Sequence, residues 1–160
     1  GELKLNMVKF DIVQTVRDVF EMEQYLAEER QISLEIINMP SKPVYVKADR
    51  KRILEVLTNL VINGIKYGKK HGFVQVSFHD LDENIMVEVT DNGIGIEKKY
   101  LPRVFERFFR VDKSRSREQG GTGLGLSIVK HIIEAHNQSI NVRSVVDQGT
   151  TFNFTLEKVK

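Results

Sequence analysis

The sequence predicts a two-layer α/β sandwich, in which a mixed, largely antiparallel sheet of about five strands is covered on one face by about three helices. Three segments repeat apolar residues at helical spacing, and several shorter segments alternate apolar and polar residues as half-buried strands do. Short turns join some of these strands in pairs, and strands joined in this way run antiparallel. The chain of 160 residues has the length of one domain with a single core, which we assign to residues 1–160.

The first part of the chain combines short strands with a long helix. Residues 8–11 predict a strand that leads into a helix, for which Asp11 is a suitable N-terminal cap. The apolar stripe of that helix continues to about Arg30. Residues 32–37 alternate as a half-buried strand, and residues 44–46 predict a short strand after a loop that contains two prolines.

A second long helix follows directly. Asp49 is suited to cap it, its apolar stripe reaches about Tyr67, and Gly68 is a typical C-terminal stop. Residues 73–79 and 85–90 then have strand character and are joined by a polar turn, which predicts an antiparallel pair.

The last part of the chain mixes loops with one more helix. The predicted elements after residue 90 are, in order, a glycine-bearing loop at 91–96, helical turns at 97–109, a polar and mobile loop at 110–121, a helix at 124–136, and strands at 139–145 and 150–157. The second of these segments contains Phe105, Phe108 and Phe109, each of which is either a core residue or an exposed docking residue.

The composition excludes several classes of protein. The chain has no cysteine, which rules out disulfides and cysteine-ligated zinc and fits a cytosolic setting. Its 24 basic and 22 acidic residues leave a net charge of +2, which is too balanced to indicate nucleic acid binding. No run approaches the roughly 20 apolar residues of a membrane span, and the first residues do not resemble a secretory leader.

Two asparagines on the second long helix have the chemistry of a metal site. Asn59 and Asn63 lie one turn apart and share a face of the helix that is not its apolar stripe. An amide oxygen is a suitable ligand for Mg²⁺ that phosphates and water also hold, and the nearby Lys66 is a point charge for phosphate. A bare pair of asparagines is more often two polar helix residues, so this pair gains meaning only from the motifs that follow.

The segment from Asp91 to Ile96 follows a strand and carries two glycines. A carboxylate at the end of a strand accepts hydrogen bonds from an exocyclic amine such as adenine N6. Gly93 and Gly95 allow the backbone to approach a flat ring closely. Alone, this pattern is equally typical of a turn.

A further glycine motif, Gly121 to Gly125, lies where a loop meets the last helix. Backbone N–H groups at the start of a helix bind phosphate oxygens, and glycines permit the dihedral angles that this needs. The motif is not a Walker loop, because no Gly-Lys-Ser/Thr follows. A Rossmann site is disfavoured as well, because the motif does not open a unit after a first strand.

Together, these motifs resemble those of the histidine kinase ATPase family, which shares its Bergerat-type nucleotide-binding fold with gyrase B, Hsp90 and MutL. The matching segments are an asparagine box at 59–67, a first glycine box at 91–95, a phenylalanine box at 102–109, a second glycine box at 121–125 and a Gly-Thr element at 149–152. The resemblance covers about residues 10–156. One departure is Gly64, where the family often has alanine.

The resemblance implies that ATP and Mg²⁺ are the ligands. Asn63 would ligate the metal with Asn59 beside it, and Asp91 would bind adenine N6, while the loop at 110–121 would be a lid over the triphosphate. The expected catalytic residues are Asn59, Asn63 and Lys66. The expected nucleotide-binding residues are Asn59, Asn63, Lys66, Tyr67, Asp91, Gly93, Gly95, Ile96, Arg110, Gly121, Thr122, Gly123, Leu124, Gly125, Leu126 and Thr150.

The resemblance further implies the catalytic part of a sensor histidine kinase, which donates the γ-phosphate of Mg-ATP to a histidine on a separate dimerisation domain. Hydrolytic relatives place a glutamate where this chain has Asn59, and an amide cannot accept a proton, so we expect negligible ATP hydrolysis by the domain alone. Glu55 lies one turn further away. The alternative is a regulatory domain that binds nucleotide without phosphotransfer. A serine kinase that binds a sigma factor would carry the glutamate, which argues against that activity.

The implied partners lie outside this chain. None of its histidines, at positions 71, 79, 131 and 136, sits in the family's acceptor motif of His-Glu with a following Arg-x-Pro. The resemblance therefore implies acceptor-histidine helices before Gly1, which dimerise in the full-length kinase, and a cognate response regulator. We expect a cytoplasmic domain of a membrane-anchored protein, monomeric on its own and without nucleic acid as a partner.

Overall fold

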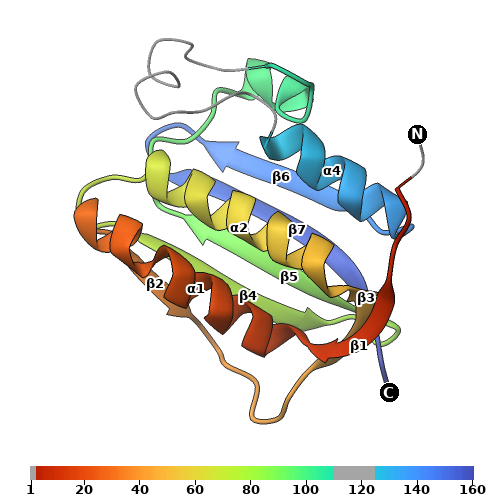
Figure 1. Cartoon of the computed structure of the whole chain (residues 1–160). Coiled ribbons are helices and arrows are strands. Elements are labelled where there is room, and N and C mark those ends of the chain that lie inside the picture. Colours follow the sequence, from red (N-terminus) through yellow and green to blue (C-terminus); the bar gives the residue numbers. More distant parts are fainter. Residues whose placement is uncertain (1–2, 110–124) are drawn as a thin grey trace.

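The computed structural model describes residues 3–109 and 125–160, which fold into two layers, a sheet and a set of helices on one of its faces (Figure 1). The elements, in chain order, are β1 (Met7–Asp11), α1 (Ile12–Glu29), β2 (Ser33–Ile36), β3 (Tyr45–Asp49), α2 (Arg50–Lys66), β4 (Phe73–Asp80), β5 (Asn84–Asp91), the 3-10 helix η1 (Lys98–Arg103), α4 (Gly125–Ala135), β6 (Ile140–Val145) and β7 (Gly149–Lys158). The two-layer mixed architecture agrees with the sequence-based prediction. None of the helices in these two described ranges is long and apolar enough to cross a bilayer.

The sheet contains seven strands, each at a segment with predicted strand character, and the short strands β1 and β3 extend the expected sheet of about five. Its order is β1-β3-β7-β5-β4-β2, and β6 lies beside β7. All pairs are antiparallel except β2 with β4. Both β6 and β3 pair with the long strand β7, the first through residues 149–154 and the second through residues 157–158. The middle of the sheet is therefore β5 and β7, directly under α2 (Figure 1).

Two aspartates begin the long helices, as predicted. The carboxylate of Asp11 accepts a hydrogen bond from the backbone N–H of Val13 at 3.0 Å, and that of Asp49 accepts one from Arg52 at 3.2 Å. Asp49 also accepts a hydrogen bond from the backbone N–H of Asn6 at 2.9 Å. The start of α2 is thereby tied to the segment through which the chain enters the domain.

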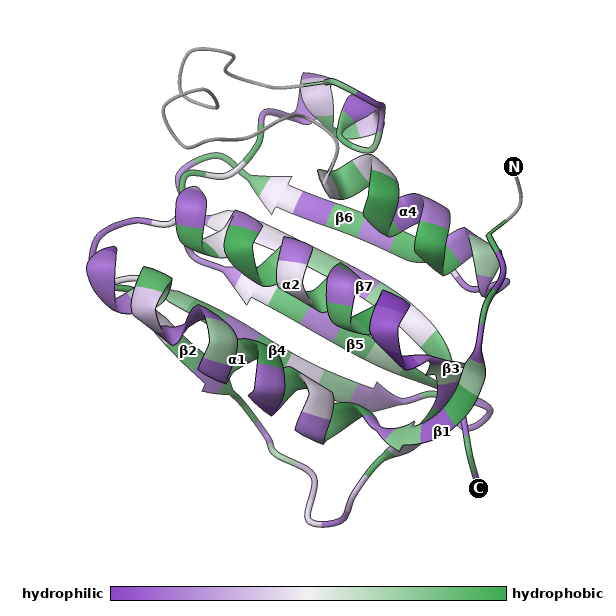
Figure 2. Cartoon of the chain, viewed as in Figure 1, coloured by the Kyte–Doolittle hydropathy of each residue, from purple (hydrophilic) through white to green (hydrophobic). Residues whose placement is uncertain are grey.

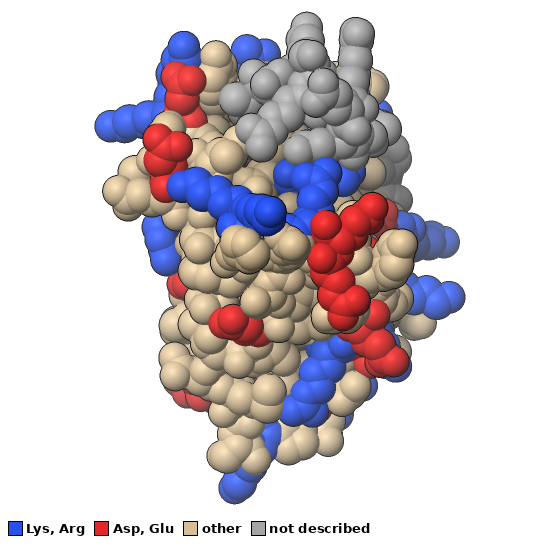
Figure 3. All heavy atoms as spheres, turned by 90° about the vertical axis from the view of Figure 1, so that its left-hand side faces the viewer, with Lys and Arg blue, Asp and Glu red and all other residues tan. Residues whose placement is uncertain are grey.

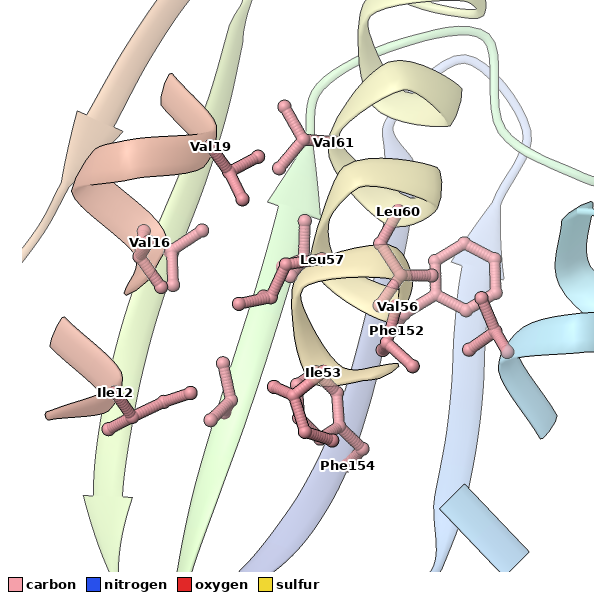
Figure 4. Packing of buried hydrophobic residues seen from close by; sticks show 14 of the residues in the cluster. Ile12, Val16, Val19, Ile53, Val56, Leu57, Leu60, Val61, Phe152 and Phe154 are labelled. Atoms are coloured by element: carbon pink, nitrogen blue, oxygen red, sulfur yellow. The ribbon is translucent and has the colours of Figure 1, made fainter. Parts of the chain in front are cut away.

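The hydrophobic core fills the space between the helices and the sheet (Figure 4). The labelled core residues are Ile12, Val16 and Val19 of α1, Ile53, Val56, Leu57, Leu60 and Val61 of α2, and Phe152 and Phe154 of β7. Figure 2 shows the sequence pattern behind this arrangement, since hydrophobic and hydrophilic residues alternate along the strands. Burial of each large apolar side chain stabilises the fold by about 1.5–3 kcal/mol.

The opposite face of the sheet is polar. On that face the hydroxyls of Thr90 and Thr151 lie 3.0 Å apart, and Arg143 forms an ion pair with Glu88 at 3.4 Å. An antiparallel sheet needs only one buried face, so water can cover the other. Polar residues are expected on the face that water covers, but not on the apolar face that the helices cover. The polar residues on the helix-covered face therefore mark the candidate site.

Candidate functional site

A row of three polar side chains crosses the helix-covered face at one end of the sheet. Thr150 of β7 is paired in register with Asp91 of β5 on one side and with Ser144 of β6 on the other. The neighbouring row, two residues further along each strand, is apolar: Val89, Phe152 and Val142. Because side chains two apart on a strand point to the same face, the polar row is continuous with the core and closes one end of it.

Asp91 is the chemical centre of this row. It is only 7% exposed, and its Oδ1 accepts hydrogen bonds from the backbone N–H groups of Gly93 at 2.9 Å and Thr150 at 3.3 Å. Burial raises the pKa of the Asp91 carboxyl to about 6, although the two backbone hydrogen bonds act in the opposite direction. Within the described residues its Oδ2 has no hydrogen-bond partner. A buried acceptor oxygen is therefore left for a donor on a ligand.

The glycine-bearing loop after β5 is wedged between α2 and the turn that joins β6 to β7. A β-carbon on Gly93 would lie 2.2 Å from the carbonyl oxygen of Tyr67, and one on Gly95 would lie 2.2 Å from that of Val145. Gly95 also has a positive φ of 73°. The backbone N–H of Ile94 donates to the carbonyl of Tyr67 at 3.1 Å. Only glycine fits at these two positions, because backbone atoms of Tyr67 and Val145 occupy the space of a side chain. The approach of this loop to a flat ring, for which the sequence suggested the glycines, stays a prediction.

Helix α2 connects this loop to the start of α4. Gly64 lies over β5, where a β-carbon would be 3.6 Å from that of Asp91. Further back along the helix, the side-chain oxygen of Asn59 is 3.3 Å from the β-carbon position of Gly125. Asn59, Asn63 and Lys66 are half-buried and share one side of α2, as predicted from their spacing, and at Asn59 this side faces the start of α4.

The structure thus brings together the predicted residues that it describes. Asp91, Gly93 and Thr150 are in contact, the end of α2 at Tyr67 meets the glycine loop, and Gly125 adjoins Asn59. Leu126 is half-buried against the core. The predicted binding residues Arg110, Gly121, Thr122, Gly123 and Leu124, and the predicted lid at 110–121, lie outside the described residues.

Two residues of the site have no role in the sequence-based prediction. The Oγ of Ser144 accepts a hydrogen bond from the backbone N–H of Ile96 at 2.7 Å, which ties β6 to the glycine loop. The side-chain oxygen of Asn92 accepts one from the backbone N–H of Phe73 at 2.8 Å, which ties the same loop to β4. Asn92 stands inside a recognised motif and was open to prediction, whereas Ser144 is one polar residue in an alternating strand and carries no local signal.

The aromatic segment after the glycine loop divides into a packed part and an exposed part. Phe105 packs edge-on against Phe152 of the core, with ring centroids 6.0 Å apart. Phe109 lies 5.9 Å from Tyr100, again between ring centroids. Phe108 is 66% exposed and has a positive φ of 63°. The predicted helical turns appear only as the short 3-10 helix η1, which contains a proline, followed by turns.

The end of the molecule where α2 finishes carries a group of basic side chains, with acidic ones along one side (Figure 3). Lys69 and Lys70, just after α2, are both exposed. The ammonium of Lys69 donates to the carbonyl of Asp147 at 2.5 Å, which joins the turn after α2 to the turn between β6 and β7. Positive charge at this end of the molecule favours a ligand that carries negative charge.

Comparison with known proteins agrees with these features. The family described as Histidine kinase-, DNA gyrase B-, and HSP90-like ATPase matches residues 48–160. The sensor histidine kinase WalK of Bacillus subtilis (strain 168) is 40% identical over 154 residues, which make up 95% of this chain and 24% of that protein. The sensor protein kinase WalK of Staphylococcus aureus is 41% identical over 125 residues, or 76% of this chain and 30% of that protein. The chain therefore spans well under half the length of these relatives.

Solved structures of histidine kinases have the same fold. The nucleotide-free catalytic domain of histidine kinase ThkA superimposes with a TM-score of 0.81 and 28% identity, covering 96% of this chain and 97% of that one. Full-length ShkA in complex with AMPPNP gives a TM-score of 0.84 at 25% identity, covering 99% of this chain and 33% of that one. ThkA in complex with the response regulator TrrA gives 0.78 at 25% identity, covering 96% and 42%.

Proposed function

Since this chain belongs to the histidine kinase-, DNA gyrase B- and HSP90-like ATPase family, we propose that it is the catalytic domain of a sensor histidine kinase. In this proposal the whole chain is one domain that binds Mg-ATP and donates the γ-phosphate to a histidine on a separate dimerisation domain. The similarity to WalK and to the ThkA catalytic domain supports this reading over the other branches of the family.

The adenine is proposed to lie at the polar row. The free Oδ2 of Asp91 is buried and able to accept a hydrogen bond from the exocyclic N6 amine of the base. Gly93 and Gly95 let the neighbouring loop pack closely against the carbonyls of Tyr67 and Val145, and Tyr67 and Ile96 flank the loop. Thr150 stands next to Asp91 in register. This buried, half-satisfied carboxylate beside a glycine loop is the single observation that carries the proposal.

The phosphates and the metal are proposed to lie along the side of α2 that Asn59, Asn63 and Lys66 share. Asn63, with Asn59 beside it, would offer an amide oxygen to Mg²⁺, and Lys66 would offer a positive charge to phosphate. Among the described residues there is no group of three His, Cys, Asp or Glu side chains suited to holding a cation. The donor set therefore fits a metal that arrives with the phosphates and takes most of its ligands from them. Mg²⁺ bound there would neutralise charge during phosphoryl transfer.

The proposed domain holds ATP for an acceptor rather than for water. Asn59 stands where a hydrolase of this fold would need a base, and an amide cannot take a proton. Glu55, one turn nearer the start of α2, is engaged in an ion pair with Arg52 at 3.3 Å. His136 is buried, whereas His71, His79 and His131 are exposed, and none of the four sits in the family's acceptor motif. We therefore place the acceptor histidine on other helices of the kinase.

Two partners are proposed, because the related sensor kinases are much longer than this chain and because one related kinase forms a complex with a response regulator. The chain corresponds to 24% of the Bacillus subtilis WalK, so the acceptor helices and any membrane anchor are proposed to belong to the rest of the full-length protein. The complex of ThkA with TrrA supports a response regulator as the second partner. Phe108, exposed beside the site, is proposed to contact the acceptor helices.

Two measurements test the proposed function. Calorimetry with ATP and Mg²⁺ should give saturable binding by this chain, and replacement of Asp91 by Ala should abolish it, whereas Thr90→Ala on the opposite face of the sheet should not. A mixture of the chain with acceptor-histidine helices should produce acid-labile phosphate on the helices. Tight ATP binding without any transfer would instead favour the alternative of a regulatory nucleotide-binding domain.

A further inference from the structure

The third member of the polar row, Ser144, makes three contacts through one oxygen atom. Its Oγ accepts from the backbone N–H of Ile96 at 2.7 Å, donates to the carbonyl of Gly149 at 2.9 Å, and lies 2.8 Å from the Oγ1 of Thr150. We propose that Ser144 is a positioning residue that orients the hydroxyl of Thr150, so that the site selects adenine over 6-oxopurines. This inference rests on the proposed binding of ATP.

The direction of the Ser144–Thr150 hydrogen bond follows from counting protons. A serine hydroxyl has one proton and two lone pairs. The carbonyl of Gly149 can only accept, so the contact at 2.9 Å uses the proton of Ser144. The N–H of Ile96 can only donate, so it occupies one lone pair of that oxygen. The remaining lone pair is left for Thr150, which must therefore donate its own proton to Ser144.

Thr150 then has no proton to offer elsewhere. Its Oγ1 presents only lone pairs, and the neighbouring Oδ2 of Asp91 is an acceptor as well whenever the carboxyl is ionised. Since Asp91 and Thr150 are paired in register on adjacent strands, the two acceptors lie side by side at the end of the sheet. A ligand that meets this pair has to supply donors.

Adenine and hypoxanthine differ at the atoms that would meet these acceptors. Adenine carries an N6 amine with two N–H donors, whereas hypoxanthine and guanine carry the acceptor O6 at that position. If O6 of a 6-oxopurine faced Oδ2 of Asp91 and Oγ1 of Thr150, all three oxygens would be buried acceptors without a donor. The free energy of leaving buried polar groups unpaired is a strong basis for rejecting such a ligand. The oriented hydroxyl of Thr150 thus adds to the discrimination that Asp91 provides.

Removal of Ser144 would release the Thr150 proton. In Ser144→Ala the hydroxyl of Thr150 is free to rotate and to donate to an O6 acceptor, so the penalty against 6-oxopurines should shrink. In Ser144→Thr a hydroxyl remains at the same place in the strand, and the penalty should persist. Comparison of the two variants therefore separates the effect of losing the hydroxyl from the effect of changing the rest of the side chain at residue 144.

The experiment measures the dissociation constants of ATP and ITP, each with Mg²⁺, for the parent chain and its variants. We expect the ratio of the ITP constant to the ATP constant to fall about tenfold in Ser144→Ala and to stay at the parent value in Ser144→Thr. The matched control is Thr151→Ala, one residue further along β7 on the opposite face, which should leave the ratio unchanged. Thermal unfolding of each variant reports whether it is folded.

The outcomes separate this inference from the proposed function. An unchanged ratio in a folded Ser144→Ala that still binds ATP would overturn the role of Ser144 and leave the proposed function intact. An equal fall of the ratio in Ser144→Ala and Ser144→Thr would also overturn it, because the hydroxyl would then not be the cause. Failure of the parent chain to bind ATP would overturn both.

Discussion

Gly64 of α2 lies directly against Asp91 of β5: a β-carbon on Gly64 would be 3.6 Å from the β-carbon of Asp91 and 2.9 Å from the Cγ2 of Val74. The absence of a side chain therefore sets how closely α2 approaches the sheet at the proposed adenine site. Asn63 directly precedes Gly64 on the helix. The same contact therefore fixes the position of Asn63, the proposed metal ligand, relative to the carboxylate of Asp91.

Gly64→Ala tests this contact. Alanine favours the helix by about 0.5–1 kcal/mol, but a methyl group forced against the fully buried Val74 costs about 1–3 kcal/mol. We expect a net loss of unfolding free energy and weaker ATP binding, measured by urea denaturation and calorimetry. A variant with raised stability and parent-like affinity would show that the helix has room to move.

The buried carboxyl of Asp91 should make stability and ATP affinity respond to pH in opposite directions. Burial raises its folded-state pKa from 3.8 to about 6, so protonation favours the folded state. This stabilisation is complete below pH 3.8 and is lost as the pH rises through about 6. ATP affinity should instead weaken below pH 6, because the protonated carboxyl is a poorer acceptor. Asp91→Asn should lack both components, and identical pH profiles for parent and variant would contradict the account.

Buried His136 is expected to contribute to stability through two side-chain hydrogen bonds, of which the one from the backbone N–H of Asp49 can be tested by substitution. The backbone N–H of Asp49 donates to its Nε2 at 3.0 Å, and its Nδ1 lies 2.8 Å from the carbonyl of Ile132. His136→Leu leaves the N–H of Asp49 buried without a partner, which costs about 1–3 kcal/mol. His136→Gln restores an acceptor, so we expect a smaller loss of unfolding free energy in urea. Equal losses in the two variants would show that packing, not this bond, is what matters.

The proposed coordination of Mg²⁺ by Asn63 is tested by removing the Asn63 amide in one experiment and the metal ion in another. Asn63→Ala should lower the affinity for ATP in the presence of Mg²⁺ to the value that the parent chain shows in EDTA. In EDTA itself, parent and variant should bind ATP equally. A variant that still gains affinity from Mg²⁺ as the parent does would place the metal ligand elsewhere.

The elements that local chemistry dictates were predictable from the sequence. Asp11 and Asp49 are aspartates directly before apolar helical stripes, and both cap helices in the structure. The glycines at 93 and 95 were recognisable because their motif has a fixed spacing, and both have the close approaches that exclude a side chain.

The features that depend on strand register were not predictable. The parallel pairing of β2 with β4 joins segments separated by a whole helix and a further strand. Ser144 reaches Thr150 only because β6 and β7 pair in one register, and a slip by one residue would turn it to the other face. All seven strands were predicted as segments, but nothing local shows that the short strands β1 and β3 join the main sheet.

The most direct test of the proposed adenine site is to follow the backbone amides of the labelled chain by NMR while ATP and Mg²⁺ are added. We expect the largest shifts at Gly93 and Thr150, whose N–H groups bind the Asp91 carboxylate, and at Gly125 beside Asn59. Shifts confined to the opposite end of α2, around Asp49, or no shifts at all at saturating nucleotide, would contradict it.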